Sequence, residues 1–189
     1  MVSVPAYLGL VGAVACQRLL ELRRARANAG WVLARGGREA GRGHYPAMVA
    51  LHAAFLASAA IEGVWFPGRL PAAVVGLALF GVIAAQALRR WAMAALGPRW
   101  TTRVVASPGL PPVTSGPYRF VRHPNYVAVA LELATLPLVR GAFLTAAAFS
   151  AADAALLAIR IPIEERALGQ EWRRAFETVP RFLPGPRRG

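Results

Sequence analysis

The chain contains no lysine, a single cysteine and few acidic residues, although it has 189 residues. One cysteine, Cys16, can build neither a disulfide framework nor a thiolate metal site. The three histidines lack the spacing of metal ligands. With 22 arginines the formal net charge is +13, which would suit a nucleic acid, but the arginines stand at the ends of apolar runs, where lipid headgroups attract them. We therefore expect membrane lipids, and no nucleic acid, as their partners.

Apolar residues make up 56% of the chain and gather in long runs. There are five such runs, at about residues 2–20, 47–66, 70–88, 126–139 and 142–159. A helix of about 20 residues crosses a bilayer. The runs predict one all-α domain, a polytopic transmembrane helical bundle of about five spans. Its last two spans would form a helical hairpin joined at Arg140-Gly141, with Pro137 distorting the first arm.

The arginines are concentrated in three segments, residues 18–42, 89–122 and 160–188. Positively charged loops stay in the cytoplasm, so the three segments would share the cytoplasmic side and the N-terminus would lie outside. The glycine-rich stretch 35–43 is expected to be a flexible loop, because no strand precedes it and it lacks the lysine of a phosphate-binding loop.

A first polar motif, Arg122-His123-Pro124-Asn125-Tyr126, precedes the fourth apolar run. Pro124 keeps His123 out of helical geometry, and Tyr118 and Tyr126 offer stacking faces beside it. Such a set could bind a polar ligand. Equally, Arg119 and Arg122 could anchor the chain at the membrane surface while His123 caps the next helix. The motif alone leaves both interpretations open.

A second polar motif runs from Arg160 to Glu165. Arg160 and Glu164 are four residues apart and would share one face of a helix. We expect Pro162 near the start of a new short helix at residues 164–176, with Glu164 and Glu165 in its first turn. The alternative is an ordinary acidic first turn with one ion pair.

Three acidic residues, Glu62, Glu132 and Asp153, lie within apolar runs. Ionisable groups are costly in hydrocarbon and face a polar interior or a partner. Glu132 and Asp153 could line a site or pair with arginines, whereas structural pairing is expected for Glu62.

Taken together, the two motifs and the segment Val113-Thr114-Ser115-Gly116-Pro117-Tyr118 resemble the isoprenylcysteine carboxyl methyltransferase family, over roughly residues 86–170. The resemblance implies an integral-membrane enzyme that uses S-adenosyl-L-methionine, held in a cytosolic cofactor pocket beneath the C-terminal helices. It divides the single domain into N-terminal spans, a cofactor-binding catalytic part and a basic tail, at residues 1–85, 86–176 and 177–189.

The resemblance also implies roles for individual residues. The cofactor-binding positions would be Arg103, Leu110, Val113, Tyr118, His123, Pro124, Asn125, Tyr126 and Glu164. Arg160 would bind the polar head of the substrate, and the catalytic residues would be Arg160, Glu164 and Glu165. Many family members have a histidine where this chain has Leu110.

Methyl transfer depends mainly on alignment in a partly dry site. A carboxylate acceptor needs no base, whereas a phenol, with a pKa near ~10, needs one such as Glu164, Glu165 or His123. The lysine-free composition suggests a bacterial inner membrane, so we expect a small lipophilic acid or phenol, of polyketide or isoprenoid origin, as the methyl acceptor.

Three other functions fit the same pattern. They are an NADPH-dependent membrane reductase of the steroid-reductase type, a phospholipid N-methyltransferase, and a small membrane transporter or scaffold that uses Glu132 and Asp153 as a polar pathway.

Overall fold

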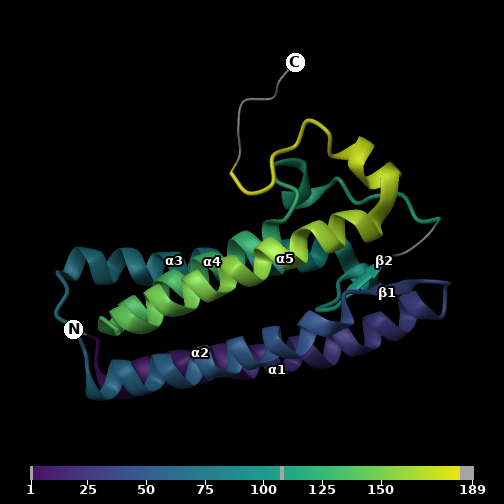
Figure 1. Cartoon of the computed structure of the whole chain (residues 1–189). Helices are drawn as coiled ribbons and strands as arrows, with labels where there is room; N and C mark the ends of the chain where they lie inside the picture. Colours follow the sequence, from purple (N-terminus) through teal and green to yellow (C-terminus); the bar gives the residue numbers. More distant parts are fainter. Residues whose placement is uncertain (1, 107–108, 184–189) are drawn as a thin grey trace.

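The computed structural model describes residues 2–106 and 109–183, and this part of the chain forms a helical bundle (Figure 1). Its α-helices are α1 (Val4–Leu33), α2 (Tyr45–Trp65), α3 (Ala72–Leu96), α4 (Pro124–Thr135) and α5 (Phe143–Ala175). In Figure 1, α1 and α2 lie side by side, and α3, α4 and α5 form a second layer against them. The all-α prediction is confirmed.

Three of these helices, α2, α3 and α5, are long and apolar enough to cross a membrane. Helix α1 is long, with 30 residues, but its apolar part ends where Arg18 and Glu21 begin a charged half. Helix α4 has only 12 residues and continues as a 3-10 turn over Pro137–Arg140. The five predicted apolar runs therefore correspond to five helices, and the expected distortion at Pro137 is present.

Helix α1 continues well beyond the end of its apolar run. Ser3 caps its first turn by accepting a hydrogen bond from the Ala6 amide, and the helix extends to Leu33. The stretch after Leu20 is rich in leucine, arginine and alanine, which favour helix, and it contains no proline. Much of the first arginine-rich segment is therefore helical.

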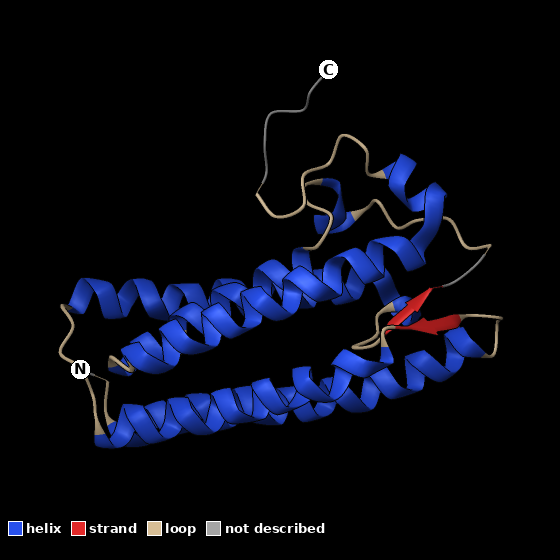
Figure 2. Cartoon of the chain, in the orientation of Figure 1, coloured by secondary structure: helices blue, strands red, loops and turns tan. Residues whose placement is uncertain are grey.

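A short antiparallel sheet joins two segments far apart in the chain (Figure 2). Strand β1 (Arg38–Ala40) pairs with β2 (Val104–Ala106), with Glu39 opposite Val105. The prediction of a flexible loop is wrong for Arg38–Ala40. The ladder that orders this segment comes from residues about 65 positions later, so no local pattern signals it.

The main apolar core lies toward the end of the bundle away from the strands. Tyr7, Phe55, Leu133 and Leu136 are completely buried there. The Tyr7 hydroxyl donates to the Ala59 carbonyl over 3.0 Å, which satisfies its one polar group inside the core.

Glu62 caps the start of α5 from the end of α2. Its carboxylate accepts hydrogen bonds from the Leu144 and Thr145 amides, at 2.9 and 2.7 Å, and from the Thr145 hydroxyl at 2.6 Å. These amides belong to the first turn of a helix, where no intrahelical acceptor exists. The structural pairing expected for Glu62 is confirmed.

Helix α5 passes through Pro162 without ending, so the prediction of a new helix near this residue is wrong. A proline inside a helix removes one hydrogen bond, here the one to the Ala158 carbonyl, and bends the helix. The interruption lies instead at Gly169, whose φ of 80° and ψ of −170° are not helical. Glu164 and Glu165 therefore occupy the interior of α5 and not a first turn.

A close contact between two glycines fixes the loop before α5. Gly141 has a φ of 71°, and a Cβ atom at this position would lie 2.3 Å from the Gly68 carbonyl oxygen. Replacing Gly141 by alanine should lower the free energy of unfolding by about 2 kcal/mol or more, because left-handed geometry and overlap both penalise the side chain. Thermal unfolding in detergent measures this loss.

Gly76→Ala provides the matched control. Gly76 lies inside α3, and a Cβ atom there meets no atom within 4 Å. This control should unfold at the wild-type temperature or above it, since alanine favours helix over glycine. Equal stability of the Gly141→Ala and Gly76→Ala proteins would contradict the close-contact explanation.

Candidate active site

A cavity of about 790 Å³ opens at the end of the bundle that carries the strands. Its walls include β2, the segment before α4 and the C-terminal half of α5, and it continues inward between α1, α2 and α5. Both polar motifs of the sequence lie at this end of the helices. This arrangement agrees with the expectation that both motifs lie on one side of the membrane.

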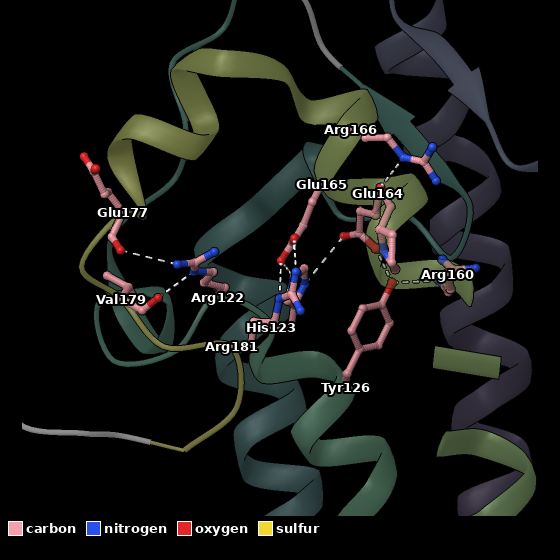
Figure 3. Close-up of polar contacts among 11 residues, drawn as sticks. Arg122, His123, Tyr126, Arg160, Glu164, Glu165, Arg166, Glu177, Val179 and Arg181 are labelled. Carbon is pink, nitrogen blue, oxygen red and sulfur yellow. Dashed lines mark hydrogen bonds and ion pairs between the residues drawn. The ribbon is translucent and has the colours of Figure 1, made fainter. Parts of the chain in front are cut away.

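The Tyr126 hydroxyl connects the two motifs (Figure 3). It accepts a hydrogen bond of 2.7 Å from Nε of Arg160 and donates one to the Glu164 carboxylate. Tyr126 stands in the first turn of α4, whereas Arg160 and Glu164 lie one turn apart on α5. The predicted shared face of Arg160 and Glu164 is therefore present, with a tyrosine between them.

Arg160 is held on three sides and is only 4% exposed. Besides Tyr126, its Nη2 donates to the Thr102 carbonyl over 2.7 Å, and its Nη1 meets the Met48 sulfur at 3.3 Å. A thioether is a weak acceptor. A ligand oxygen in the cavity that binds Nη1 would therefore displace only this weak contact. The hydrogen bonds to Tyr126 and Thr102 fix the plane of the guanidinium group.

Glu165 faces away from the cavity and orients His123. Nε2 of His123 lies 3.1 Å from Oε1 of Glu165, and because a carboxylate only accepts, this nitrogen donates. Arg181 binds both oxygens of Glu165, at 3.0 and 2.7 Å, and this hydrogen bonding raises the pKa of Arg181 above its ordinary value. The imidazole stacks on Tyr126 at 5.3 Å and lies 5.7 Å from Trp172.

The backbone of the C-terminal segment is hydrogen-bonded to the first motif. The Arg122 amide donates to the Pro180 carbonyl over 2.9 Å, and the His123 amide donates to the Arg181 carbonyl over 3.2 Å. Nε of Arg122 donates to the Val179 carbonyl over 2.5 Å. The Arg122 side chain thus binds the C-terminal segment. His123 occupies the N-cap position of α4, as that interpretation expected, but its side chain makes no capping hydrogen bond and contacts Glu165 instead.

Asn125 and Tyr118 present polar groups on the cavity wall. The Asn125 Oδ1 atom is buried and has no hydrogen-bond partner among the residues that the structure describes. Burial, and secondarily the charge of Glu164, raise the pKa of the Tyr118 hydroxyl above its usual range. Tyr118 is therefore a neutral hydroxyl at physiological pH and not a base.

The segment before the first motif completes the wall. Leu110 and Val113 line the cavity, and Nη1 of Arg99 donates to the intervening Pro111 carbonyl over 2.6 Å. Arg103 also lines it, with its guanidinium 3.5 Å from Glu39 and above the Tyr45 ring.

Most of the site residues expected from the sequence thus surround one cavity. The residues on its wall are Arg103, Leu110, Val113, Tyr118, His123, Asn125, Tyr126, Arg160 and Glu164. Pro124 is buried at the start of α4 and Glu165 lies behind His123, so these two do not line it.

Sequence reasoning missed Trp172, Arg181 and Phe182. It treated residues 177–189 as a basic tail, of which 184–189 lie outside the described part of the structure. The Phe182 ring is 6.4 Å from His123, and Arg181 reaches Glu165 across 16 positions of the chain. No spacing rule signals such contacts, and the only hint is an arginine directly after a proline.

These features define an integral membrane protein, a helical bundle with a polar cavity at one end. The model of the isoprenylcysteine carboxyl methyltransferase (ICMT) family matches residues 75–170. The chain is also 35% identical over 159 residues to "Uncharacterized protein YpbQ" of Bacillus subtilis (strain 168), covering 84% of this chain and 94% of that relative. The chain belongs to the ICMT family, which is a family of membrane methyltransferases.

Arg181→Ala should loosen the C-terminal segment over His123. Losing a half-exposed bidentate pair costs roughly 1 kcal/mol, which corresponds to about fivefold faster hydrogen exchange of the Arg122 and His123 amides. Mass spectrometry of peptides spanning these residues measures it. Arg173→Ala is the control: it also removes one positive charge, but from an exposed side chain, and it should leave the exchange rates of these amides unchanged. Unaltered exchange in the Arg181→Ala protein would refute the role of this pair.

Proposed function

We propose that this protein transfers the methyl group of S-adenosyl-L-methionine to an oxygen, either a carboxylate or a phenol, of a lipophilic substrate. The observation that carries the proposal is the Tyr126 hydroxyl, which holds Arg160 and Glu164 side by side on the wall of one cavity. A guanidinium attracts an acceptor oxygen and a carboxylate attracts a cationic cofactor. Two reactants of opposite charge character would therefore meet beside Tyr126.

The cavity wall suits the groups of this cofactor. Glu164 supplies a negative charge for its cationic groups, and the faces of Tyr126 and Trp172 suit a sulfonium or a purine ring. The unpartnered Oδ1 of Asn125 is an acceptor for an N–H donor, and an unsatisfied buried acceptor is costly unless a ligand completes it. When bound, the cofactor supplies an electrophilic methyl group.

The residues of the chain would orient the acceptor and exclude water. Nη1 of Arg160 would bind the acceptor oxygen in place of the Met48 sulfur. Trp172 and the segment that carries Arg181 shield His123 from solvent. Alignment and exclusion of water are the main requirements when the acceptor is already a carboxylate. For a phenol, Glu164 and His123 remain candidate bases, whereas Glu165 is engaged with Arg181.

The inner part of the cavity is suited to a lipid chain. It continues between α1, α2 and α5 along apolar side chains that include Leu19, Leu56 and Leu157. Burial of such a chain contributes about 0.8 kcal/mol for each methylene group. The arginine-rich segments favour the cytoplasmic side of a bacterial inner membrane for the open end of the cavity.

Incubation of the purified protein with labelled S-adenosyl-L-methionine and a lipid extract of its host tests the proposal. A labelled ester or aryl ether is expected. Tyr126→Phe should lower kcat/KM about 10- to 100-fold, because it removes hydrogen bonds to two charged groups. Tyr7→Phe is the matched control, since its hydroxyl donates to the Ala59 carbonyl in the apolar core away from the cavity wall, and it should retain activity.

Other outcomes would favour the competing functions. Binding of NADPH without binding of S-adenosylhomocysteine would indicate a reductase, and label on nitrogen would indicate phospholipid N-methylation. If Glu132→Ala or Asp153→Ala abolishes function while Tyr126→Phe has no effect, a transporter gains support. Glu132 is already held by Arg18 and Gln86, which favours a structural role for it.

A further inference from the structure

A second polar cluster lines the same cavity deeper in the bundle. Its members come from four helices: Arg18 and Glu21 on α1, His52 on α2, Arg89 on α3 and Asp153 on α5. None of them belongs to the motifs around Tyr126. Within the described residues, Arg89 has donors without a hydrogen-bond partner and Asp153 makes no hydrogen bond.

Arg89 is 5% exposed, and its Nε and Nη2 atoms are buried without a hydrogen-bond partner in the described part of the structure. Its only ion pair there is with Glu21, at 3.5 Å from Nη1. Unpaired buried donors on a guanidinium are costly, and these belong to a residue of the cavity wall. A ligand oxygen in the cavity would satisfy them.

Asp153 is 2% exposed, and no hydrogen bond joins its carboxyl group to any of the residues described. It also lines the cavity. A buried carboxyl group without a protein partner is unusual. Together, Asp153 and Arg89 place a carboxyl group and unused N–H donors around one space.

The charges of the cluster indicate what kind of group fits. Arg18 is bound by both Glu21 and Glu132, and Arg89 is paired with Glu21. Two arginines thus face two glutamates, and Asp153 adds a further acidic group. A second carboxylate on the ligand would be repelled here. An uncharged carbonyl or hydroxyl oxygen would not be repelled. It can accept hydrogen bonds from Arg89, and a hydroxyl can also donate to the carboxyl group of Asp153.

The distance between the two polar regions follows from α5. Asp153 precedes Arg160 by seven residues, which is about 10 Å along a helix that rises 1.5 Å per residue. Apolar side chains line the cavity between them, among them Leu156, Leu157 and Val129. The cavity is therefore polar at both ends of an apolar middle.

From this we infer that the substrate carries a second, uncharged oxygen group, a carbonyl or a hydroxyl, bound by Arg89 and Asp153 about 10 Å from the oxygen that accepts the methyl group. The identity of that accepting oxygen rests on the proposed function. The deep subsite itself rests on the unpartnered groups of Arg89 and Asp153 alone. A hydrocarbon tail without oxygen would leave both groups unsatisfied.

Three synthetic probes test the inference on the whole protein in detergent. They are hexadecanoic acid, its analogue with a ketone about eight bonds from the carboxyl group, and a dicarboxylic acid of the same span, since extended carbon chains advance about 1.3 Å per bond. Calorimetric titration should show the keto acid binding about tenfold more tightly than hexadecanoic acid, and the diacid more weakly than the keto acid. Equal affinity of all three would overturn the inference.

Two variants locate the effect. Arg89→Met removes the donors while Glu21 keeps Arg18 as its partner, so the protein should fold and lose the preference for the ketone. Asp153→Asn should keep or raise Tm, because the carboxyl group has no protein partner to lose, and it should weaken binding of the corresponding hydroxy acid. Ser150→Ala, one turn earlier on α5 and off the cavity wall, should change neither property. A large fall in Tm for Asp153→Asn, with the ketone preference intact in Arg89→Met, would assign the cluster a purely structural role.

The result is separable from the proposed function. If methyl transfer is observed but the protein shows no preference for the keto acid, the inference of a deep subsite is overturned and the proposed function stands. If the protein prefers the keto acid but binds no S-adenosylhomocysteine, the deep subsite is supported and the proposed methyltransferase function is overturned.

Discussion

The bundle depends on one arginine placed among acids in its interior. Arg18 on α1 donates to Glu21 on its own helix and to Glu132 on α4, and Gln86 on α3 donates to the same Glu132 carboxylate. Three helices are thereby fixed at one level by charged hydrogen bonds. Gln17 and Arg89 contact the same network through Glu21, and removing one partner from a buried ion pair is strongly destabilising. This constraint also sets the floor of the cavity, because the same level carries Arg89 and Asp153.

The upper part of the cavity depends on a different kind of constraint. Glu165 is bound by His123 from the segment before α4 and by Arg181 from the C-terminal segment. Glu164, the next residue toward the N-terminus, is turned to Tyr126 instead. Two adjacent glutamates on α5 therefore point in different directions, one toward the cavity and one toward the segment that covers it. Adjacent side chains on a helix point about 100° apart, so α5 itself separates the two glutamates, but the sequence does not tell which of them faces the cavity.

The sequence was most informative where local rules decide the structure. Apolar runs located all five helices, and the Tyr126 and Arg160 motifs led to the residues around the cavity. Local rules failed where distant parts of the chain compete with them. Pro162 should begin a helix by its own preference, but the packing of Ile161 and Arg160, both buried, continues α5 through it. The pairing of Glu39 with Val105 and of Arg181 with Glu165 depends on chain contacts that no short pattern contains.

The position of Arg181 in the chain has a consequence for biosynthesis. A ribosome makes the protein from its N-terminus, so all five helices have been synthesised before Arg181 is. Until then Glu165 lacks its arginine, and no acceptor from residues 180 and 181 holds the amides of Arg122 and His123. A nascent chain that lacks this segment would therefore have its helices but not the complete wall of the cavity. The wall around His123 is therefore completed last, when the C-terminal segment binds Arg122, His123 and Glu165.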